Sequence, residues 1–287
     1  TSYPARGSCY ALGAPCGCTF GRRKVALSFC ARESGVESDT RRPSRSQVIE
    51  KLHTRAVSKR VAIVQSNYIP WKGYFDLINL VDEFILFDDV QYTKRDWRNR
   101  NLIKTPSGLH WLTIPVQVKG KYLQRIRDTQ VSEPSWARQH WQTLAHHYGR
   151  APHFRAFAAR VEAAYEQAQS MEWLSAINRL FLGHIAEILG TRARITSSMD
   201  YDVIEGKTER LLHLCQQAGA TEYLSGPAAR AYLDEAAFAA AGIGVAFMEY
   251  DGYPEYPQSH PPFEHGVTIL DLLFNVGADA PRFMKSF

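Results

Sequence analysis

The stretch VAIVQSNYIPWKGYFDLINLVDEFILF, residues 61–87, decides the fold. Its two ends, 61–65 and 83–87, are short apolar runs without alternation, which is typical of strands buried on both faces. Between them, residues 72–81 place Phe75 and Ile78 on one face of a helix. The stretch therefore predicts a strand, a helix and a second, parallel strand.

The rest of the chain repeats this alternation after an interruption. Residues 91–131 are interpreted as a β-rich insertion around a turn at 106–108. Three helical patterns follow, and short apolar runs then alternate with helical patterns to the end. The helices after the insertion are predicted at 134–148, 154–169 and 171–189, the later strands at 193–196, 221–224 and 245–249, and the later helices at 207–218, 228–241 and about 268–276. The class is therefore α/β: a Rossmann-like parallel sheet with a β-rich insertion and a helical segment.

Residues 1–60 differ in composition from the rest of the chain. They hold 12 of the 34 Lys and Arg residues, 4 of the 29 Asp and Glu residues, and four of the five cysteines. The cysteines lack the paired C-x₂-C spacing of a zinc ribbon, so no metal site is predicted. Without periodicity, this stretch is expected to be a disordered or non-domain extension before one domain at 61–287. The chain does not begin with Met, so one interpretation is translated upstream sequence from a mispredicted start. The alternative is a targeting arm, which Glu33, Glu37 and Asp39 disfavour.

Residues 61–287 give little reason to expect nucleic-acid or membrane partners. They contain 22 basic and 25 acidic residues, so no global positive charge favours nucleic acid. No apolar run approaches ~18 residues, and no secretory h-region supports export. We therefore expect no membrane span and a cytoplasmic location. The patterns predict no oligomeric state.

Polar or small residues follow all five predicted parallel strands. Ligands of open α/β sheets bind outside the carboxyl ends of the strands, which makes these positions the candidate site. The alternative is that loops are polar whatever their function. The strand ends are Gln65-Ser66-Asn67, Asp88-Asp89, Ser197-Ser198, Ser225-Gly226 and Tyr250-Asp251, of which Gln65, Asn67, Ser225 and Gly226 are predicted to bind substrate.

The first strand end continues into the turn QSNYIPWKGY, residues 65–74. In Rossmann-type folds this turn holds phosphate on helix N-terminal N–H groups. It is not G-x-G-x-x-G, and no Walker A motif occurs in the sequence, which disfavours dinucleotide and P-loop chemistry. We predict instead that Lys72 neutralises an anion and that Tyr68 contacts substrate. Alternatively, the aromatic residues of the turn only pack and Lys72 is solvated.

Residues 88–104 (DDVQYTKRDWRNRNLIK) combine acidic, basic and aromatic side chains. Arginine binds phosphate or carboxylate bidentately, and Tyr92 or Trp97 could stack on a base or sugar ring. Asp88 or Asp89 could act as a base or hold Mg²⁺ through water. The alternative is a solvated loop of mixed charge. This segment supplies Asp88 and Asp89 as predicted catalytic residues, and Tyr92, Arg98, Asn99 and Arg100 as predicted substrate-binding residues.

Residues 250–271 (YDGYPEYPQSHPPFEHGVTILD) hold the candidate acid–base groups His260, His265, Glu255 and Glu264. We take His260 as the catalytic candidate. The two histidines, five residues apart with prolines between them, make a poor metal motif. A lone loop histidine is more often structural or solvated.

Two blocks of the sequence resemble the WbqC-like family of bacterial proteins. The first lies within 61–118 and contains AIVQSNYIPWKGYFDLI, FILFDDVQYTKRDWRNRN and WLTIPV; the second contains TEYLSGPAARAYLDEAAF and YPQSHPPFEHGVTILDLLFNVG. The resemblance runs from about residue 61 to the end. Residues 1–60 fall outside it, which favours their interpretation as an extension.

The resemblance implies a role in the biosynthesis of O-antigen, the outer part of lipopolysaccharide, or of another surface polysaccharide. We expect an enzyme that transfers an acyl, aminoacyl or nucleotidyl group to an activated (nucleotide-) sugar by positioning and electrostatic stabilisation. The alternative is a non-catalytic protein of the same pathway that binds or assembles a sugar precursor. Both functions imply a small phosphate-bearing or nucleotide-sugar ligand.

Overall fold

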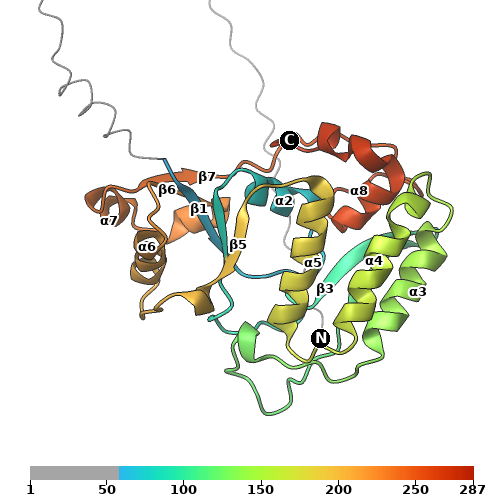
Figure 1. Cartoon of the computed structure of the whole chain (residues 1–287), viewed down its shortest axis with the longest axis horizontal. Coiled ribbons are helices and arrows are strands. Elements are labelled where there is room, and N and C mark those ends of the chain that lie inside the picture. Colours follow the sequence, from blue (N-terminus) through green and yellow to red (C-terminus); the bar gives the residue numbers. More distant parts are fainter. Residues whose placement is uncertain (1–57) are drawn as a thin grey trace, which may run out of the picture. The chain divides into compact units, whose positions relative to one another are not determined.

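The computed structural model describes residues 58–287, and Figure 1 shows how the elements are arranged. The predictions made for residues 1–57 lie outside this described part. The strands are β1 (Arg60–Val64), β2 (Glu83–Leu86), β3 (Arg100–Thr105), β4 (Gly108–Thr113), β5 (Arg194–Ser197), β6 (Glu222–Ser225) and β7 (Gly244–Phe247). The α-helices are α2 (Lys72–Asn79), α3 (Trp136–Tyr148), α4 (Phe154–Ala168), α5 (Leu174–Leu189), α6 (Thr208–Gln217), α7 (Glu235–Ala240) and α8 (Ile269–Val276).

A five-stranded sheet with the order β5-β2-β1-β6-β7 forms the centre of the fold. All four neighbouring pairs are parallel. Ala62 of β1 packs into a core that includes α2 and α8, whereas Val61 and Ile63 pack against α6 and α7 on the opposite face. Burial on both faces explains the unbroken apolar run in the sequence. The Rossmann-like α/β prediction is confirmed.

The insertion after β2 builds the second part of the fold. Strands β3 and β4 form an antiparallel hairpin, and the three long helices then pack in order, α3 on α4 and α4 on α5 (Figure 1). Their core is aromatic, with Trp136, Tyr165 and Phe181 buried together. Tyr68 and Ile69, in the turn after β1, belong to the same buried core.

One predicted helix, 228–241, is divided in the structure. A 3₁₀ segment, Pro227–Ala231, is followed by α7. Asp234 caps α7 because its side chain accepts hydrogen bonds from the N–H groups of Ala236 and Ala237. A capped start opens a new helix, so the expectation of one continuous helix was wrong. The predicted last helix instead continues beyond α8 as a 3₁₀ segment, Gly277–Phe283.

The sheet opens at its centre. Strands β1 and β2 pair over four residues, but β1 and β6 pair only at Arg60 with Glu222 and at Val61 with Tyr223. The helix that follows β1 and the helix that precedes β6 lie on opposite faces, which makes this the point where the strand order reverses. Parallel sheets bind ligands at such a point.

Asp271 of α8 is a buried carboxylate that joins distant parts of the chain. It accepts hydrogen bonds from the Tyr148 hydroxyl at 2.7 Å, the Tyr256 hydroxyl at 2.6 Å and the Gln258 amide at 2.9 Å. Burial raises the pKa of Asp271, while these donors oppose the shift. The network ties α3 and the loop before α8 to α8 itself.

No helix within residues 58–287 has both the length and the apolar character required to cross a bilayer.

Glu83 provides a pH-dependent contribution to stability. Its buried carboxylate accepts from the Lys59 ammonium at 2.7 Å, the Thr196 hydroxyl at 2.8 Å and the Tyr201 hydroxyl. Burial raises the pKa of Glu83, but these donors outweigh it and hold the pKa below its ordinary value. Because the folded-state pKa is lower than the unfolded one, the ionised carboxylate stabilises the fold above the unfolded value and loses this effect as the pH falls through the folded value.

We therefore expect Glu83→Gln to reduce the free energy of unfolding most at neutral pH, with a difference from wild type that shrinks below about pH 4. Urea denaturation of both proteins between pH 3.5 and 7 measures this difference. Glu187→Gln, which removes an exposed partner of Arg160, should have little effect at any pH. A Glu83→Gln difference that stays constant with pH would contradict the assignment.

Candidate functional site

The turn between β1 and α2 is the centre of the candidate site, and other segments satisfy its polar groups. The Ser66 N–H donates to the Asp88 carboxylate at 2.9 Å. The Asn101 amide donates to the carbonyls of both Tyr68 and Ile69 at 3.0 Å. Ile69 has φ of 35°, a left-handed conformation that costs a branched residue about 1–3 kcal/mol. The turn is therefore held by the residues that surround it.

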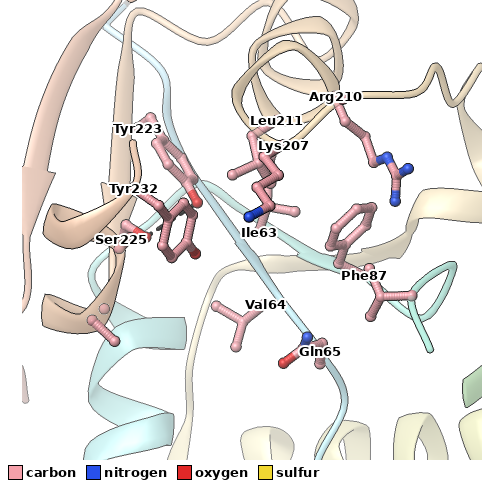
Figure 2. A pocket seen from close by; sticks show the side chains of 15 residues that line it. Ile63, Val64, Gln65, Phe87, Lys207, Arg210, Leu211, Tyr223, Ser225 and Tyr232 are labelled. Atoms are coloured by element: carbon pink, nitrogen blue, oxygen red, sulfur yellow. Dashed lines mark hydrogen bonds between the residues drawn. The ribbon is translucent and has the colours of Figure 1, made fainter. Parts of the chain in front are cut away.

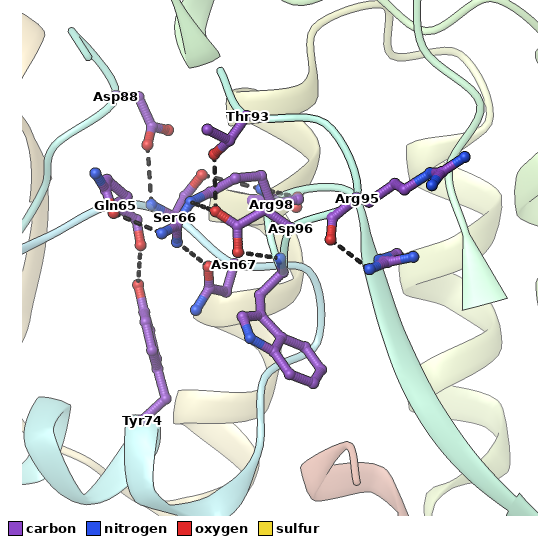
Figure 3. Close-up of polar contacts among 12 residues, drawn as sticks. Gln65, Ser66, Asn67, Tyr74, Asp88, Thr93, Arg95, Asp96 and Arg98 are labelled. Atoms are coloured by element: carbon purple, nitrogen blue, oxygen red, sulfur yellow. Dashed lines mark hydrogen bonds and ion pairs between the residues drawn. The ribbon is translucent and has the colours of Figure 1, made fainter. Parts of the chain in front are cut away.

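Arg98 links the end of β1 to the insertion. Its guanidinium donates to the Gln65 side-chain oxygen at 2.5 Å and to the Asn67 side-chain oxygen, and Figure 3 shows it between the two. The Arg98 carbonyl accepts from the amide of Asn178 in α5 at 2.9 Å. Arg98 thus fixes two side chains that point from alternate residues of one turn.

A first cavity of about 510 Å³ lies where β1 and β6 diverge (Figure 2). Lys207 and Gln65 face the space from opposite sides, and Tyr232 and Phe87 flank it. Its lining contains two cations and no acidic side chain; the residues are Ile63, Val64, Gln65, Phe87, Val90, Gly206, Lys207, Arg210, Leu211, Tyr223, Ser225, Gly226, Ala228, Ala229 and Tyr232. This composition suits an anionic ligand that carries an aromatic or apolar part.

Lys207 and Arg210 lie at the start of α6, where the helix dipole is positive. Cations are unfavourable there unless an anion accompanies them. Sequence reasoning did not select these residues, although the predicted helix 207–218 begins with K-T-E-R. Glu209, between them in the first turn of α6, supplies an acidic neighbour, so the signal available in the sequence was only the pair of cations at a predicted helix start.

A second cavity of about 280 Å³ lies on the other side of Arg98. It is lined by Asn67, Pro70, Trp71, Trp97, Asn101, His265 and Gly266. The lining joins the three segments that the sequence singled out: the first turn, the insertion and the loop before α8. Two backbone hydrogen bonds, from Thr268 to Leu102 and from Ile269 to Pro70, both of 2.9 Å, hold that loop in place.

Trp71 is fixed by its aromatic neighbours and by a glycine. Its ring centroid lies 5.3 Å from that of Tyr250 and 5.3 Å from that of Tyr253. A Cβ atom on Gly73 would come within 2.4 Å of the indole. Gly73 therefore makes room for the Trp71 ring beside the first turn of α2.

The structure places the predicted site residues in several different environments. Gln65, Ser225 and Gly226 line the first cavity, and Asn67 lines the second. Arg98 lies between the cavities. The remaining predicted residues line neither of the two: Tyr68, Lys72, Asp88, Asp89, Tyr92, Asn99, Arg100 and His260.

The two aspartates predicted as catalytic make protein contacts. Asp88 is almost completely buried, and its carboxylate accepts a hydrogen bond from the Ser66 N–H. Burial raises the pKa of Asp88. Asp89 contacts the Arg127 guanidinium at 2.5 Å and accepts from Ser198 at 2.6 Å, beside a third cavity of about 330 Å³. Within residues 58–287, no three His, Cys, Asp or Glu side chains are grouped so that they could hold a metal ion.

Several predicted substrate contacts are buried. Tyr68 lies in the helical core. Its hydroxyl oxygen lies 2.6 Å from the Tyr165 hydroxyl oxygen and 2.9 Å from Nδ1 of His140. Tyr92 is buried near the start of the insertion. Asn99 donates its amide to the Ile114 carbonyl at 2.8 Å. These side chains hold the frame of the site.

Lys72 is buried rather than solvated. Its ammonium donates to the Pro254 carbonyl at 2.9 Å and lies 5.1 Å and 5.2 Å from the ring centroids of Tyr253 and Tyr256. Burial lowers the pKa of Lys72 to about 8. The charge therefore lies beside the second cavity, close enough to His265 to lower the pKa of that ring.

Arg100 in β3 and His260 in the loop before α8 are both half-buried. Arg100 stacks over the Trp111 ring at 4.0 Å, and its guanidinium donates to the Arg95 carbonyl. His260 has φ of 63° and is one of the charges that lower the pKa of His147. Its catalytic role stays a prediction.

Residues 65–283 match the WbqC-like protein family. The chain belongs to this family. It is also 55% identical over 227 residues to the uncharacterized protein Rv1507c of Mycobacterium tuberculosis, a match that covers 79% of this chain and 98% of that protein. No solved structure matches the chain. The WbqC-like region includes the turn, the insertion, α6 and the loop before α8, so both cavities lie almost wholly within it.

We expect Gly73→Ala to destabilise the WbqC-like fold by about 1–3 kcal/mol, because the added methyl group meets a tryptophan that cannot move away. Urea denaturation measures the effect. Gly183→Ala in α5 is the matched control, since its Cβ would meet no atom within 4 Å and alanine should stabilise the helix by about 0.5–1 kcal/mol. Equal stability changes in the two variants would show that the Trp71 ring is not constrained.

Proposed function

We propose that this WbqC-like protein is an enzyme of O-antigen or other surface-polysaccharide biosynthesis. It binds a phosphate-bearing or nucleotide ligand in the first cavity and transfers an acyl, aminoacyl or nucleotidyl group to an activated sugar. The pathway is the one that the resemblance to WbqC-like proteins implies, and the cavity supports the class of ligand. We place the activity in the cytoplasm, with no nucleic acid as partner.

The observation that carries the proposal is the pair of cations at the strand reversal. Lys207 and Arg210 border a cavity at the carboxyl ends of β1 and β6, and no carboxylate in its lining neutralises them. A phosphate there would gain charge-assisted hydrogen bonds and the field of the α6 N-terminus. The exposed ring of Tyr232 supplies aromatic surface for a base.

A second candidate function is a non-catalytic protein that binds or assembles a sugar precursor in the same pathway. The contacts of Asp88 and Asp89 favour this function, because both carboxylates are bound by other groups of the protein. The two functions share the ligand and differ in turnover. Mass spectrometry of the full chain incubated with a bound nucleotide-sugar and each candidate donor separates them, because only the enzyme forms a modified sugar.

The first experiment is a thermal-shift screen of the full chain with ATP, CTP, nucleotide-sugars and acyl-CoAs, each with Mg²⁺. A ligand at 100 times its Kd adds about 2.7 kcal/mol to the apparent stability. A shift with ATP or CTP supports nucleotidyl transfer, and a shift with acyl-CoA supports acyl transfer. If no ligand in the panel stabilises the protein, the proposal of a phosphate-binding first cavity is wrong.

We expect Arg210→Ala to raise the Kd of the best phosphate-bearing ligand by about tenfold or more, since a charge-assisted hydrogen bond is lost. Isothermal titration calorimetry measures the Kd. Arg155→Ala, which removes an exposed arginine of α4, is the control for the change in net charge. An Arg210→Ala protein that binds as tightly as wild type would rule out this cation as a phosphate ligand.

A further inference from the structure

The second cavity differs from the first in its chemistry. None of its seven lining residues is a formally charged Lys, Arg, Asp or Glu. Two tryptophans and a proline supply apolar surface, and two asparagines and a histidine supply hydrogen-bonding groups. Such a lining suits a compact, uncharged ligand that has an apolar face and polar edges.

Trp97 lines this cavity and has a partly exposed ring. Its side chain is 41% exposed although Trp71, on the same cavity, is packed between two tyrosines. The ring centroids of Trp97 and Trp111 lie 5.4 Å apart. The Arg100 guanidinium stacks over the Trp111 ring. The Trp97 carbonyl accepts from the Tyr68 N–H at 3.0 Å, so its backbone is fixed to the first turn. A fixed backbone and a partly exposed ring make a stacking surface.

The polar side chains of the cavity can form hydrogen bonds with hydroxyl or amide groups of a ligand. Asn67 accepts from Arg98 through its amide oxygen, and its amide nitrogen remains as a donor. Burial and the charge of Lys72 hold the pKa of His265 below its ordinary value, so the ring is neutral at pH 7 and has one donor and one acceptor. The Nδ1 atom of His265 is shielded from solvent and has no hydrogen-bond partner among residues 58–287.

The two cavities are connected through one arginine. Gln65 lines the first cavity, Asn67 lines the second, and Arg98 bonds to both side chains. The residues are two apart in sequence, so their Cα atoms lie within about 7 Å of each other and the two cavities border neighbouring positions of one turn.

We propose that the second cavity binds the sugar ring of a nucleotide-sugar, stacked on Trp97 and oriented by Asn67 and His265. The inference rests on the proposed function, because it takes the phosphates to lie in the first cavity. A pyranose ring fits the lining: its C–H face is apolar, its edge carries hydroxyl groups, and it has no charge. A nucleobase would also stack, but the aromatic surface of the first cavity, beside the cations, serves the base.

The test compares nucleoside diphosphates with their sugars on the full chain. Isothermal titration calorimetry gives the Kd of UDP, UDP-glucose, GDP and GDP-mannose for wild type, Trp97→Ala, Arg210→Ala and Trp173→Ala. Trp173 is the matched control because it is 43% exposed, lies at the start of α5 and does not line the cavity. Denaturation curves without ligand verify that each variant is folded.

We expect at least one nucleotide-sugar to bind wild type about tenfold more tightly than its diphosphate. Trp97→Ala should remove this difference and leave diphosphate binding unchanged, whereas Arg210→Ala should weaken both ligands. Trp173→Ala should behave as wild type. An advantage of the sugar that survives in Trp97→Ala overturns the inference and leaves the function of the first cavity intact. Equal losses for diphosphate and nucleotide-sugar in Trp97→Ala overturn it too, since the base would then occupy the second cavity.

Free methyl glycosides separate this inference from the proposed function. Quenching of tryptophan fluorescence by methyl glucoside or methyl mannoside, lost in Trp97→Ala and kept in Trp173→Ala, would support a sugar site even if no nucleotide binds. That outcome would reject the proposed phosphate site in the first cavity and keep the sugar site in the second. Absence of both nucleotide-sugar and glycoside binding overturns the inference.

Discussion

The structure depends on a largely buried turn, residues 65–71, whose polar groups are paired inside the protein. The turn after β1 must satisfy its N–H and carbonyl groups inside the protein, because an unpaired buried group costs as much as a lost hydrogen bond. Asp88, Asn101 and Tyr74 each take one or two of these groups, and the Trp97 and Ile269 backbones take others. Segments far apart in sequence are therefore brought to one place, and the two cavities form on either side of it.

The fold could be predicted from the sequence where packing is periodic. The unbroken apolar runs at β1 and β2 indicate burial on both faces, and the long amphipathic helices α3, α4 and α5 fall within a few residues of their predicted bounds. The division of the helix at 228–241 was not foreseen, because Asp234 reads equally well as an exposed helical residue and as a cap. The strand order also required the structure, since periodicity carries no information on which strands are neighbours.

The candidate site was predictable only as a region. Sequence reasoning located polar residues at the strand ends, and Gln65, Asn67 and Ser225 do line cavities. It could not distinguish a side chain that binds a ligand from one that binds the protein's own backbone, because both tasks need the same donors and acceptors. Asp88 and Asn99 belong to the second kind. Lys207 and Arg210 were missed because they are more than 100 residues from the turn they face.

Asp271 has a consequence for how the family can vary. Loss of Tyr148 leaves the buried Oδ2 of Asp271 without a hydrogen-bond donor, and loss of Tyr256 or Gln258 removes one of the donors to Oδ1. A single substitution is therefore disfavoured, while a joint replacement by apolar groups of similar shape costs little. We expect these four positions to be inherited as a unit, so that lineages which lack the acid at 271 also lack the hydroxyl groups at 148 and 256.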